Sequence, residues 1–291
     1  MLQTKWILFA LIFLVSNILV AQDTTQKNLI KKLGISKSEH YAFIVKNGIM
    51  SKDSNIILSN KYNKEGFVYE EVEYQYETTN ENGRVKSGDV VATSRFDYLN
   101  DSILINKKLL LGDNPTPYST MKLSYNSKGL KKKELITLFN NSKITTKYKY
   151  NKANRLVLES KNRFNTNRSN IQYFYNTKGE LKEILSNSLY SPSKTLYYDE
   201  SSKHIHSTKL GSSEDGFMLE KYEYDKENRI IKESIYYEKE KLIVFLGEVV
   251  TAKSKNELTT ETSYSQNGLI EYKKYWFNNI YQGIEKIKYV L

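Results

Sequence analysis

The chain has 291 residues, with 44 Lys and Arg against 33 Asp and Glu and a formal net charge of +11 at pH 7. It contains no Cys, which excludes a small domain held together by disulfides. The length is enough for one large domain or two ordinary ones.

An apolar run near the N-terminus predicts a signal peptide. Lys5 precedes the run Trp6–Val20, which is shorter than the ~20 residues of a membrane-spanning helix. We expect cleavage after Ala21 or Gln22, so that residues 1–21 are removed and the mature chain has no membrane span. The protein would then be periplasmic, on the outer surface or secreted, in a Gram-negative-type bacterium. The alternative is an uncleaved membrane anchor.

After the signal peptide, residues 22–112 are predicted to form an N-terminal β region, with a short helix at 25–33 that ends at Gly34. The run Gly112–Pro117 holds two of the three prolines, which cannot donate hydrogen bonds within a central strand. We therefore place a boundary there and assign 113–291 to hairpin repeats. One continuous sheet through both regions is the alternative.

A short motif recurs along the chain. It consists of an aromatic strand end, Tyr-Asn or Tyr-Asp, two polar residues, Gly or Asn, and an aliphatic residue. Five of its tyrosines are spaced by 25, 25, 23 and 26 residues, which predicts a repeat architecture. The turn positions are Tyr62, Asn63, Gly66, Tyr125, Asn126, Gly129, Tyr150, Asn151, Asn154, Tyr175, Asn176, Gly179, Tyr198, Asp199, Tyr224, Asp225, Asn228 and Gly268.

The residue types of this motif predict a β-hairpin. The Asn or Asp side chain accepts a hydrogen bond from a backbone N–H two residues later. Gly or Asn three residues later takes a positive φ, which suits a type I turn with a G1 bulge. The expected fold is all-β, with antiparallel hairpins forming one elongated, curved open sheet. Between the last two copies, the apolar run Leu242–Val250 predicts one extra strand.

A Glu follows most copies of the motif at a fixed distance, at Glu71, Glu134, Glu159 and Glu233. A pair of carboxylates suggests a glycan-acting hydrolase, but such a site needs a cleft and perturbed pKa values. A cross-strand charge ladder beside lysines explains the pattern better. The lysines themselves are spread along the chain, with a dense run at 131–133, and predict a solvated sheet face.

The Tyr-Asn/Asp-x-x-Gly/Asn pattern resembles the YD repeats of bacterial YD-repeat and RHS-repeat proteins. The resemblance covers mainly residues 121–236, with outlying copies near Tyr62 and Tyr264. It implies β-hairpins joined into a long curling sheet, and in that family the repeats are linked to carbohydrate binding and to shells around toxins. This chain is too short to build such a shell.

Few residues suggest a chemical site. His204 and His206 would share one face of a strand as half of a metal site, but no third ligand is evident, and we expect neither a metal nor a cofactor. Aromatic residues outside the repeat register are candidate ligand contacts: Tyr275, Trp276, Phe277 and Tyr281.

The sequence therefore predicts an exported, non-enzymatic repeat protein that binds an envelope polysaccharide or a protein partner through a sheet face. Nucleic acid is not an expected partner outside the cytoplasm. The alternatives are a hydrolase that uses a Glu pair and a scaffold or immunity-type partner of a toxin.

Overall fold

The computed structural model describes residues 20–46, 49–50, 55–74, 89–163, 167–186, 193–198, 205–212, 216–245, 248–253 and 256–291. The chain divides into two compact units. One unit comprises Lys27–Tyr41, Ser54–Tyr173 and Ile287–Leu291, and the other contains Ala42–Asp53, Phe174–Lys286 and the residues up to Gln26.

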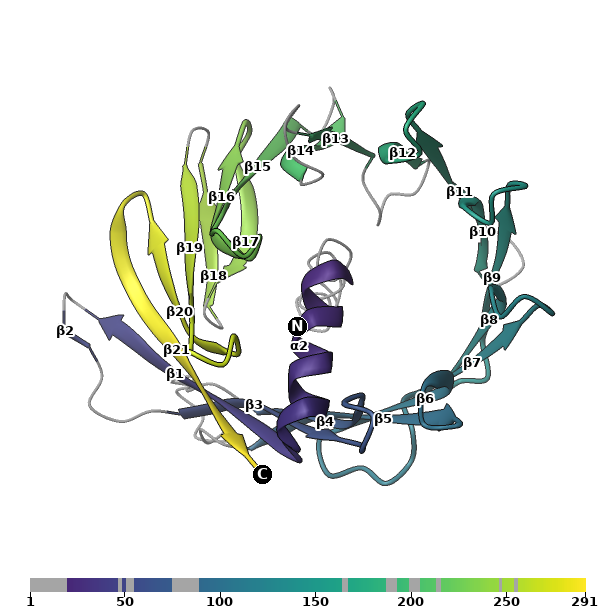
Figure 1. Cartoon of the computed structure of the whole chain (residues 1–291), viewed down its shortest axis with the longest axis horizontal. Helices are drawn as coiled ribbons and strands as arrows, with labels where there is room; N and C mark the ends of the chain where they lie inside the picture. Colours follow the sequence, from purple (N-terminus) through teal and green to yellow (C-terminus); the bar gives the residue numbers. More distant parts are fainter. Residues whose placement is uncertain are drawn as a thin grey trace. The chain divides into compact units, whose positions relative to one another are not determined.

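Nearly all the described elements are strands, which confirms the all-β prediction (Figure 1). The helix α2 covers Val20–Leu33 and ends at Gly34, whose φ is +66°. The strands are β1 (Lys37–Lys46), β2 (Ile49–Met50), β3 (Asn55–Tyr62), β4 (Val68–Tyr74), β5 (Val90–Leu99), β6 (Ile103–Leu111), β7 (Ser119–Tyr125), β8 (Lys131–Leu138), β9 (Lys143–Tyr150), β10 (Leu156–Arg163), β11 (Asn167–Tyr175), β12 (Leu181–Ser186), β13 (Lys194–Tyr198), β14 (Ile205–Ser212), β15 (Gly216–Tyr224), β16 (Ile230–Tyr237), β17 (Lys241–Phe245), β18 (Glu248–Ala252), β19 (Glu257–Tyr264), β20 (Ile270–Phe277) and β21 (Ile280–Val290).

Most consecutive strands pair in an antiparallel manner, and together they build a 19-stranded sheet that leaves out β17 and β18. The proline-containing loop does not interrupt this sheet, because β6 and β7 on its two sides pair directly with each other. No described helix is long and apolar enough to cross a membrane.

The pairing of β1 contradicts the expected open sheet. β1 pairs with β3 and also with the last strand, β21. Where these strands meet, the N–H of Ser36 donates to the carbonyl of Val290 at 2.9 Å, and the N–H of Tyr62 donates to the carbonyl of Ser36 at 2.9 Å. The first and last strands therefore do not leave two free edges. Turn chemistry is local and carries no information on this long-range pairing.

The stretch between β16 and β19 also differs from the prediction of one extra strand. β16 pairs directly with β19, while β17 and β18 form a separate two-stranded sheet. Ala252 at the end of β18 is fully buried and belongs to a cluster with Tyr237 and Phe277. Apolar packing thus holds this hairpin against the strands that it interrupts in sequence.

The repeat turns share one geometry. In the copy after β9, the N–H groups of Ala153 and Arg155 donate to Asn151 Oδ1 at 3.0 and 2.9 Å. Asn154 has a φ of +59°, and the pairing register shifts by one residue beside Tyr150. The same positive φ occurs in the other copies, at Gly66, Gly129, Gly179, Asn228 and Gly268. This is a turn followed by a left-handed residue and a bulge.

The motif tyrosines bind the preceding repeat. The hydroxyl of Tyr224 donates to the carbonyl of Ile205 at 2.8 Å, and that of Tyr264 donates to the carbonyl of Ile230 at 2.9 Å. In the other unit, Tyr125 donates in the same way to the carbonyl of Leu104. Each such tyrosine reaches the start of the returning strand one repeat earlier, so the motif fixes the contact between repeats as well as the turn.

Candidate binding face

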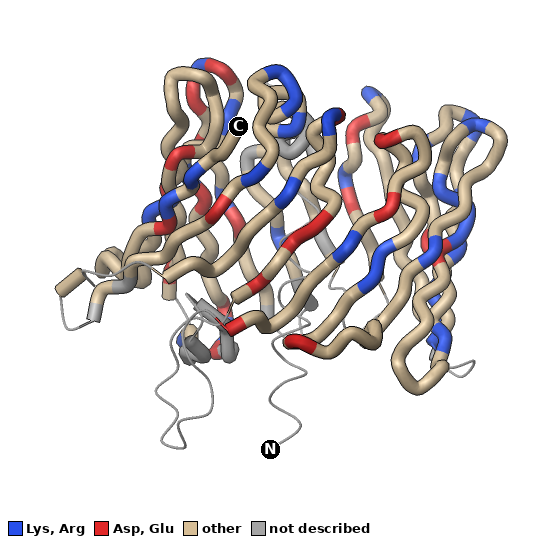
Figure 2. The backbone as a smooth tube through the Cα atoms, turned by 90° about the horizontal axis from the view of Figure 1, so that it is seen from below, with Lys and Arg blue, Asp and Glu red and all other residues tan. Residues whose placement is uncertain are grey.

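The net positive charge of the chain is concentrated in the segment that contains β6–β11. Residues 103–175 hold fifteen Lys and Arg against three Asp and Glu, a difference of twelve that matches the excess of the whole chain within one charge. The positive charge is therefore concentrated on a few neighbouring strands. Figure 2 shows Lys and Arg recurring on adjacent stretches of backbone. Lysines and arginines also occur throughout the rest of the chain, and this segment stands out because it holds few acids, which a count of charge per segment shows from the sequence.

Six of these lysines lie on one face of β6–β9. Residues directly opposite each other in paired strands share a face, and the register pairs Lys133 with Lys147 and Thr137 with Lys143. The same face continues through Ser124, opposite Lys133, to the neighbouring strands. We call this the basic face and define it as Lys108, Lys122, Lys133, Lys143, Lys147 and Lys149, all of which are exposed.

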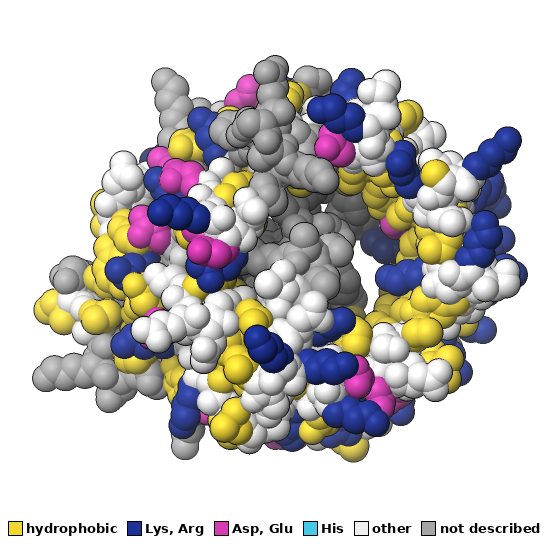
Figure 3. Space-filling model, viewed as in Figure 1, with side chains coloured by type: hydrophobic (Ala, Val, Ile, Leu, Met, Phe, Trp, Pro, Cys, Tyr) yellow, Lys and Arg dark blue, Asp and Glu magenta, His cyan; other side chains and the backbone are white. Residues whose placement is uncertain are grey.

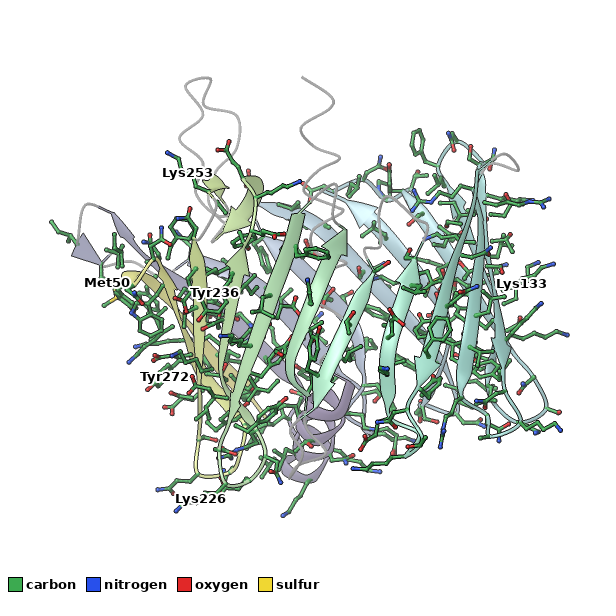
Figure 4. All side chains as sticks on the ribbon, turned by 90° about the horizontal axis from the view of Figure 1, so that it is seen from above. Met50, Lys133, Lys226, Tyr236, Lys253 and Tyr272 are labelled. Atoms are coloured by element: carbon green, nitrogen blue, oxygen red, sulfur yellow. The ribbon has the colours of Figure 1, made fainter. Side chains whose placement is uncertain are left out.

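The lysines of the basic face form no ion pair within the part of the chain that the structure describes. Lys133 and Lys147 stand directly opposite each other, an arrangement that destabilises a sheet by roughly 0.2–1 kcal/mol. Lys133 points away from the ribbon (Figure 4), and dark-blue side chains project from this part of the sheet (Figure 3).

The opposite face of the same strands carries the recurring glutamates, and their partners are tyrosines. The hydroxyl of Tyr148 donates to Glu134 Oε2 at 3.3 Å, and the hydroxyl of Tyr173 donates to Glu159 Oε1 at 2.6 Å. In each pair the tyrosine comes fourteen residues after the glutamate and belongs to the next repeat. We call this the tyrosine–glutamate face. Its glutamates join neighbouring hairpins through tyrosine hydroxyls.

Tyrosine–glutamate hydrogen bonds also occur in the other unit, within one strand and within one hairpin rather than between repeats. Tyr222 donates to Glu220 Oε2 at 2.7 Å, and Tyr275 donates to Glu285 Oε2 at 2.6 Å. Burial, together with the negative charge of the carboxylate, raises the pKa of Tyr222 and that of Tyr275 well above the usual value. These hydroxyls therefore remain protonated donors at neutral pH.

Lysines also lie on the tyrosine–glutamate face, among them Lys107, which is opposite Met121, and Lys161. Lys161 is opposite Thr146, which is itself opposite Glu134. Burial lowers the pKa of Lys161, and the charge of Arg163 lowers it further, while Glu134 and Glu159 act in the opposite sense. This face thus combines half-buried charges of both signs, in contrast to the exposed and uniformly positive basic face.

The aromatic residues proposed as ligand contacts are mostly engaged within the protein. The hydroxyl of Tyr275 is bonded to Glu285. Trp276 and Tyr281 are opposite each other across β20 and β21, with ring centroids 5.6 Å apart. Phe277 packs against the cluster around Tyr237. Their contacts give them a structural role at the end of the chain.

The remaining candidates give no site. Ala21 and Gln22 lie within α2. Tyr198 pairs with Ile205 at a register shift, while His204, Asp199 and the side chain of His206 lie outside the described residues. Among the described residues, no group of three His, Asp or Glu side chains is placed to hold a metal ion.

Comparisons with known proteins give only distant similarities. No family model matches the sequence, and no curated protein is similar to it. Membership of the YD-repeat family therefore stays a prediction.

Among solved structures, a porin-like protein from Bacteroides uniformis is 10% identical, with 88% of this chain and 96% of that chain covered and a TM-score of 0.47. A porin-like protein from Bacteroides vulgatus is 8% identical, with 88% and 98% covered and a TM-score of 0.25. The TccC3 mutant of the Photorhabdus luminescens Tc holotoxin pore is 11% identical, with 84% of this chain but 14% of the toxin chain covered and a TM-score of 0.35.

Proposed function

We propose that this protein is an exported, non-enzymatic component of a bacterial envelope that binds a partner through an exposed sheet face. The observation that carries the proposal is the contrast between the two faces of β6–β11. One face uses its glutamates for hydrogen bonds between repeats, and the other presents six exposed lysines.

The strand pairing of β1 supports a framework held together without disulfide bonds. Because β1 pairs with both β3 and β21, edges of these strands that would invite aggregation are covered. We propose that this pairing stabilises the mature protein outside the cytoplasm.

The basic face belongs in water rather than in lipid. Strands that cross a membrane present apolar side chains to the lipid, and a Lys at the bilayer midplane costs ~2–4 kcal/mol. Several exposed lysines on adjacent strands exclude that environment for β6–β9. We therefore place this face in the aqueous part of the envelope, where it is open to a partner.

The hydrolase alternative is disfavoured by the partners of the glutamates. A general acid and a nucleophile must meet a substrate, whereas Glu134 and Glu159 each accept a hydrogen bond from the tyrosine of the next repeat. These glutamates recur because the whole hairpin motif repeats, and the tyrosines that bind them recur for the same reason.

The proposal is tested by the double variant Glu134→Gln and Glu159→Gln. Gln retains an oxygen that accepts from tyrosine, so we expect a folded protein that is captured with its envelope partner as efficiently as the natural chain. Release of sugar from purified envelope polysaccharide by the natural chain, abolished in the folded double variant, would overturn the proposal.

A further inference from the structure

We propose that the basic face of β6–β9 binds an acidic polysaccharide, through carboxylate or phosphate groups on its sugars. This inference rests on the function proposed above and adds the chemistry of the partner. It begins from the geometry of the six lysines, which lie on four consecutive strands of one unit.

The lysines form a two-dimensional array. Neighbouring strands are ~4.8 Å apart, and residues two apart along a strand are ~6.8 Å apart. Lys147 and Lys149 occupy two such positions on β9, and Lys133 faces Lys147 from β8. These distances are shorter than the Debye length of ~8 Å at physiological ionic strength. The positive fields of the lysines therefore overlap, and an isolated small anion would neutralise only part of the array.

A polymer with regularly repeated negative charges satisfies the array better than a small anion. Each bound anionic group relieves repulsion between lysines that the protein leaves without acidic partners among the described residues. Lys is a flexible point charge, so the face does not impose the planar, two-pronged geometry that Arg provides. The use of Lys therefore favours a polymer recognised by its charge density over a ligand that needs bidentate hydrogen bonds from Arg.

The side chains between the lysines suit a hydrated sugar chain. Thr120, Ser124, Thr137 and Thr145 lie on the same face. Thr120 is opposite Thr137, Ser124 is opposite Lys133, and Thr145 is opposite Leu135. Their hydroxyls both donate and accept hydrogen bonds, as the hydroxyls of a saccharide do. Two apolar residues of this face are Leu135, opposite Lys122 and Thr145, and Leu110, two residues after Lys108 on β6. The face is thus polar between its charges, as a polysaccharide site requires.

Acids border the basic face at β4 and β5, where Asp97 is opposite Asn106 of β6. Arg95 of β5 is directly opposite Lys108 but is paired with Glu70 at 3.1 Å. Glu70 also accepts from Lys61 at 2.8 Å. The surface charge therefore becomes mixed at β4 and β5, which limits the binding face to the strands that follow.

The test compares two triple variants of the full chain, both of which remove three positive charges. The first is Lys122→Gln, Lys133→Gln and Lys147→Gln on the basic face. The control is Lys226→Gln, Lys253→Gln and Lys288→Gln, three exposed residues elsewhere. Circular dichroism and urea denaturation establish that both variants are folded. If the first does not fold, the single variants Lys133→Gln and Lys147→Gln replace it.

The probes are polygalacturonate for carboxylates, a phosphorylated mannan for phosphates, neutral dextran and duplex DNA. By calorimetry at 50 mM salt, we expect one or both acidic polysaccharides to bind the natural chain and dextran not to bind. The basic-face variant should bind at least tenfold more weakly, and the control variant within about twofold. The acidic polymer that binds identifies the anionic group.

Equal losses in the two triple variants, or DNA binding as tight as that of the polysaccharides, would overturn the inference by indicating a general attraction to polyanions. Absence of binding to either acidic polysaccharide would also overturn it. Capture of an envelope partner by the natural chain in that case would leave the proposed binding function standing with a partner of different chemistry.

Discussion

The hydroxyl of Tyr264 donates to the backbone carbonyl of Ile230 at 2.9 Å, across 34 residues of sequence. Tyr264 ends one incoming strand, and Ile230 begins the returning strand of the preceding repeat. The guanidinium of Arg229, the residue before Ile230, lies 4.4 Å from the centre of the Tyr264 ring. One tyrosine thus combines a hydrogen bond and a cation–π contact to the same neighbouring turn.

Replacing Tyr264 by Phe removes the hydrogen bond and keeps the ring. We expect the free energy of unfolding to fall by about 0.5–1.5 kcal/mol, the usual contribution of one hydrogen bond. Urea denaturation monitored by circular dichroism measures this change. The control is Tyr69→Phe, because Tyr69 is an exposed tyrosine outside the motif position; an equal loss in both variants would show that the contact between repeats contributes nothing.

The same tyrosine predicts a dependence of stability on alkaline pH. Burial raises the pKa of Tyr264 to about 12, against about 10 in the unfolded chain. The folded state therefore retains the proton that the unfolded state loses. This stabilisation is complete below pH 10 and decreases as the pH rises towards 12. The natural chain should lose more stability over this interval than Tyr264→Phe, and parallel curves for the two proteins would contradict the assignment.

Substitution of two turn glycines, Gly66 and Gly129, distinguishes the cost of backbone strain from the cost of a steric clash. Gly66 and Gly129 have similar positive φ values, +77° and +74°. A Cβ on Gly66 would lie 2.5 Å from the carbonyl oxygen of Lys27 in α2, whereas a Cβ on Gly129 meets nothing within 4 Å. Gly129→Ala should cost about 1–2 kcal/mol from the left-handed conformation alone. Gly66→Ala should cost clearly more because α2 must shift.

Urea denaturation of the two variants side by side measures the difference. Equal destabilisation would show that α2 does not pack against this turn in solution. A greater loss of stability in Gly66→Ala would support the packing of the C-terminal half of α2 against this turn. That packing includes an ion pair between Lys31 and Glu65.

The sequence predicts the local features of this fold because they depend on short-range chemistry. Asn151 and Asn154 belong to a turn whose hydrogen bonds span four residues, and period-two alternation places Tyr148 and Tyr150 on one face. The pairing of Ser36 with Val290 connects residues 254 apart in sequence, and no motif at either end of the chain encodes it. The pairing of β1 with β21 therefore could not be predicted.

The basic face could not be recognised from the sequence for a different reason. Lys133 and Lys147 are fourteen residues apart, and only the strand register shows that they are directly opposite each other. Their neighbour Glu134 suggests mixed charge in the sequence, but it points to the other face, where Tyr148 is its partner. The alternation of a strand separates charges that are adjacent in sequence.

The most direct test of the account measures the reactivity of individual lysines. The natural chain is acetylated with and without an acidic polysaccharide, and the modified residues are quantified by mass spectrometry. We predict protection of Lys122, Lys133, Lys147 and Lys149, with unchanged labelling of Lys226 and Lys253. Equal protection of all exposed lysines, or protection confined to residues outside β6–β9, would contradict the assignment of the basic face as the binding surface.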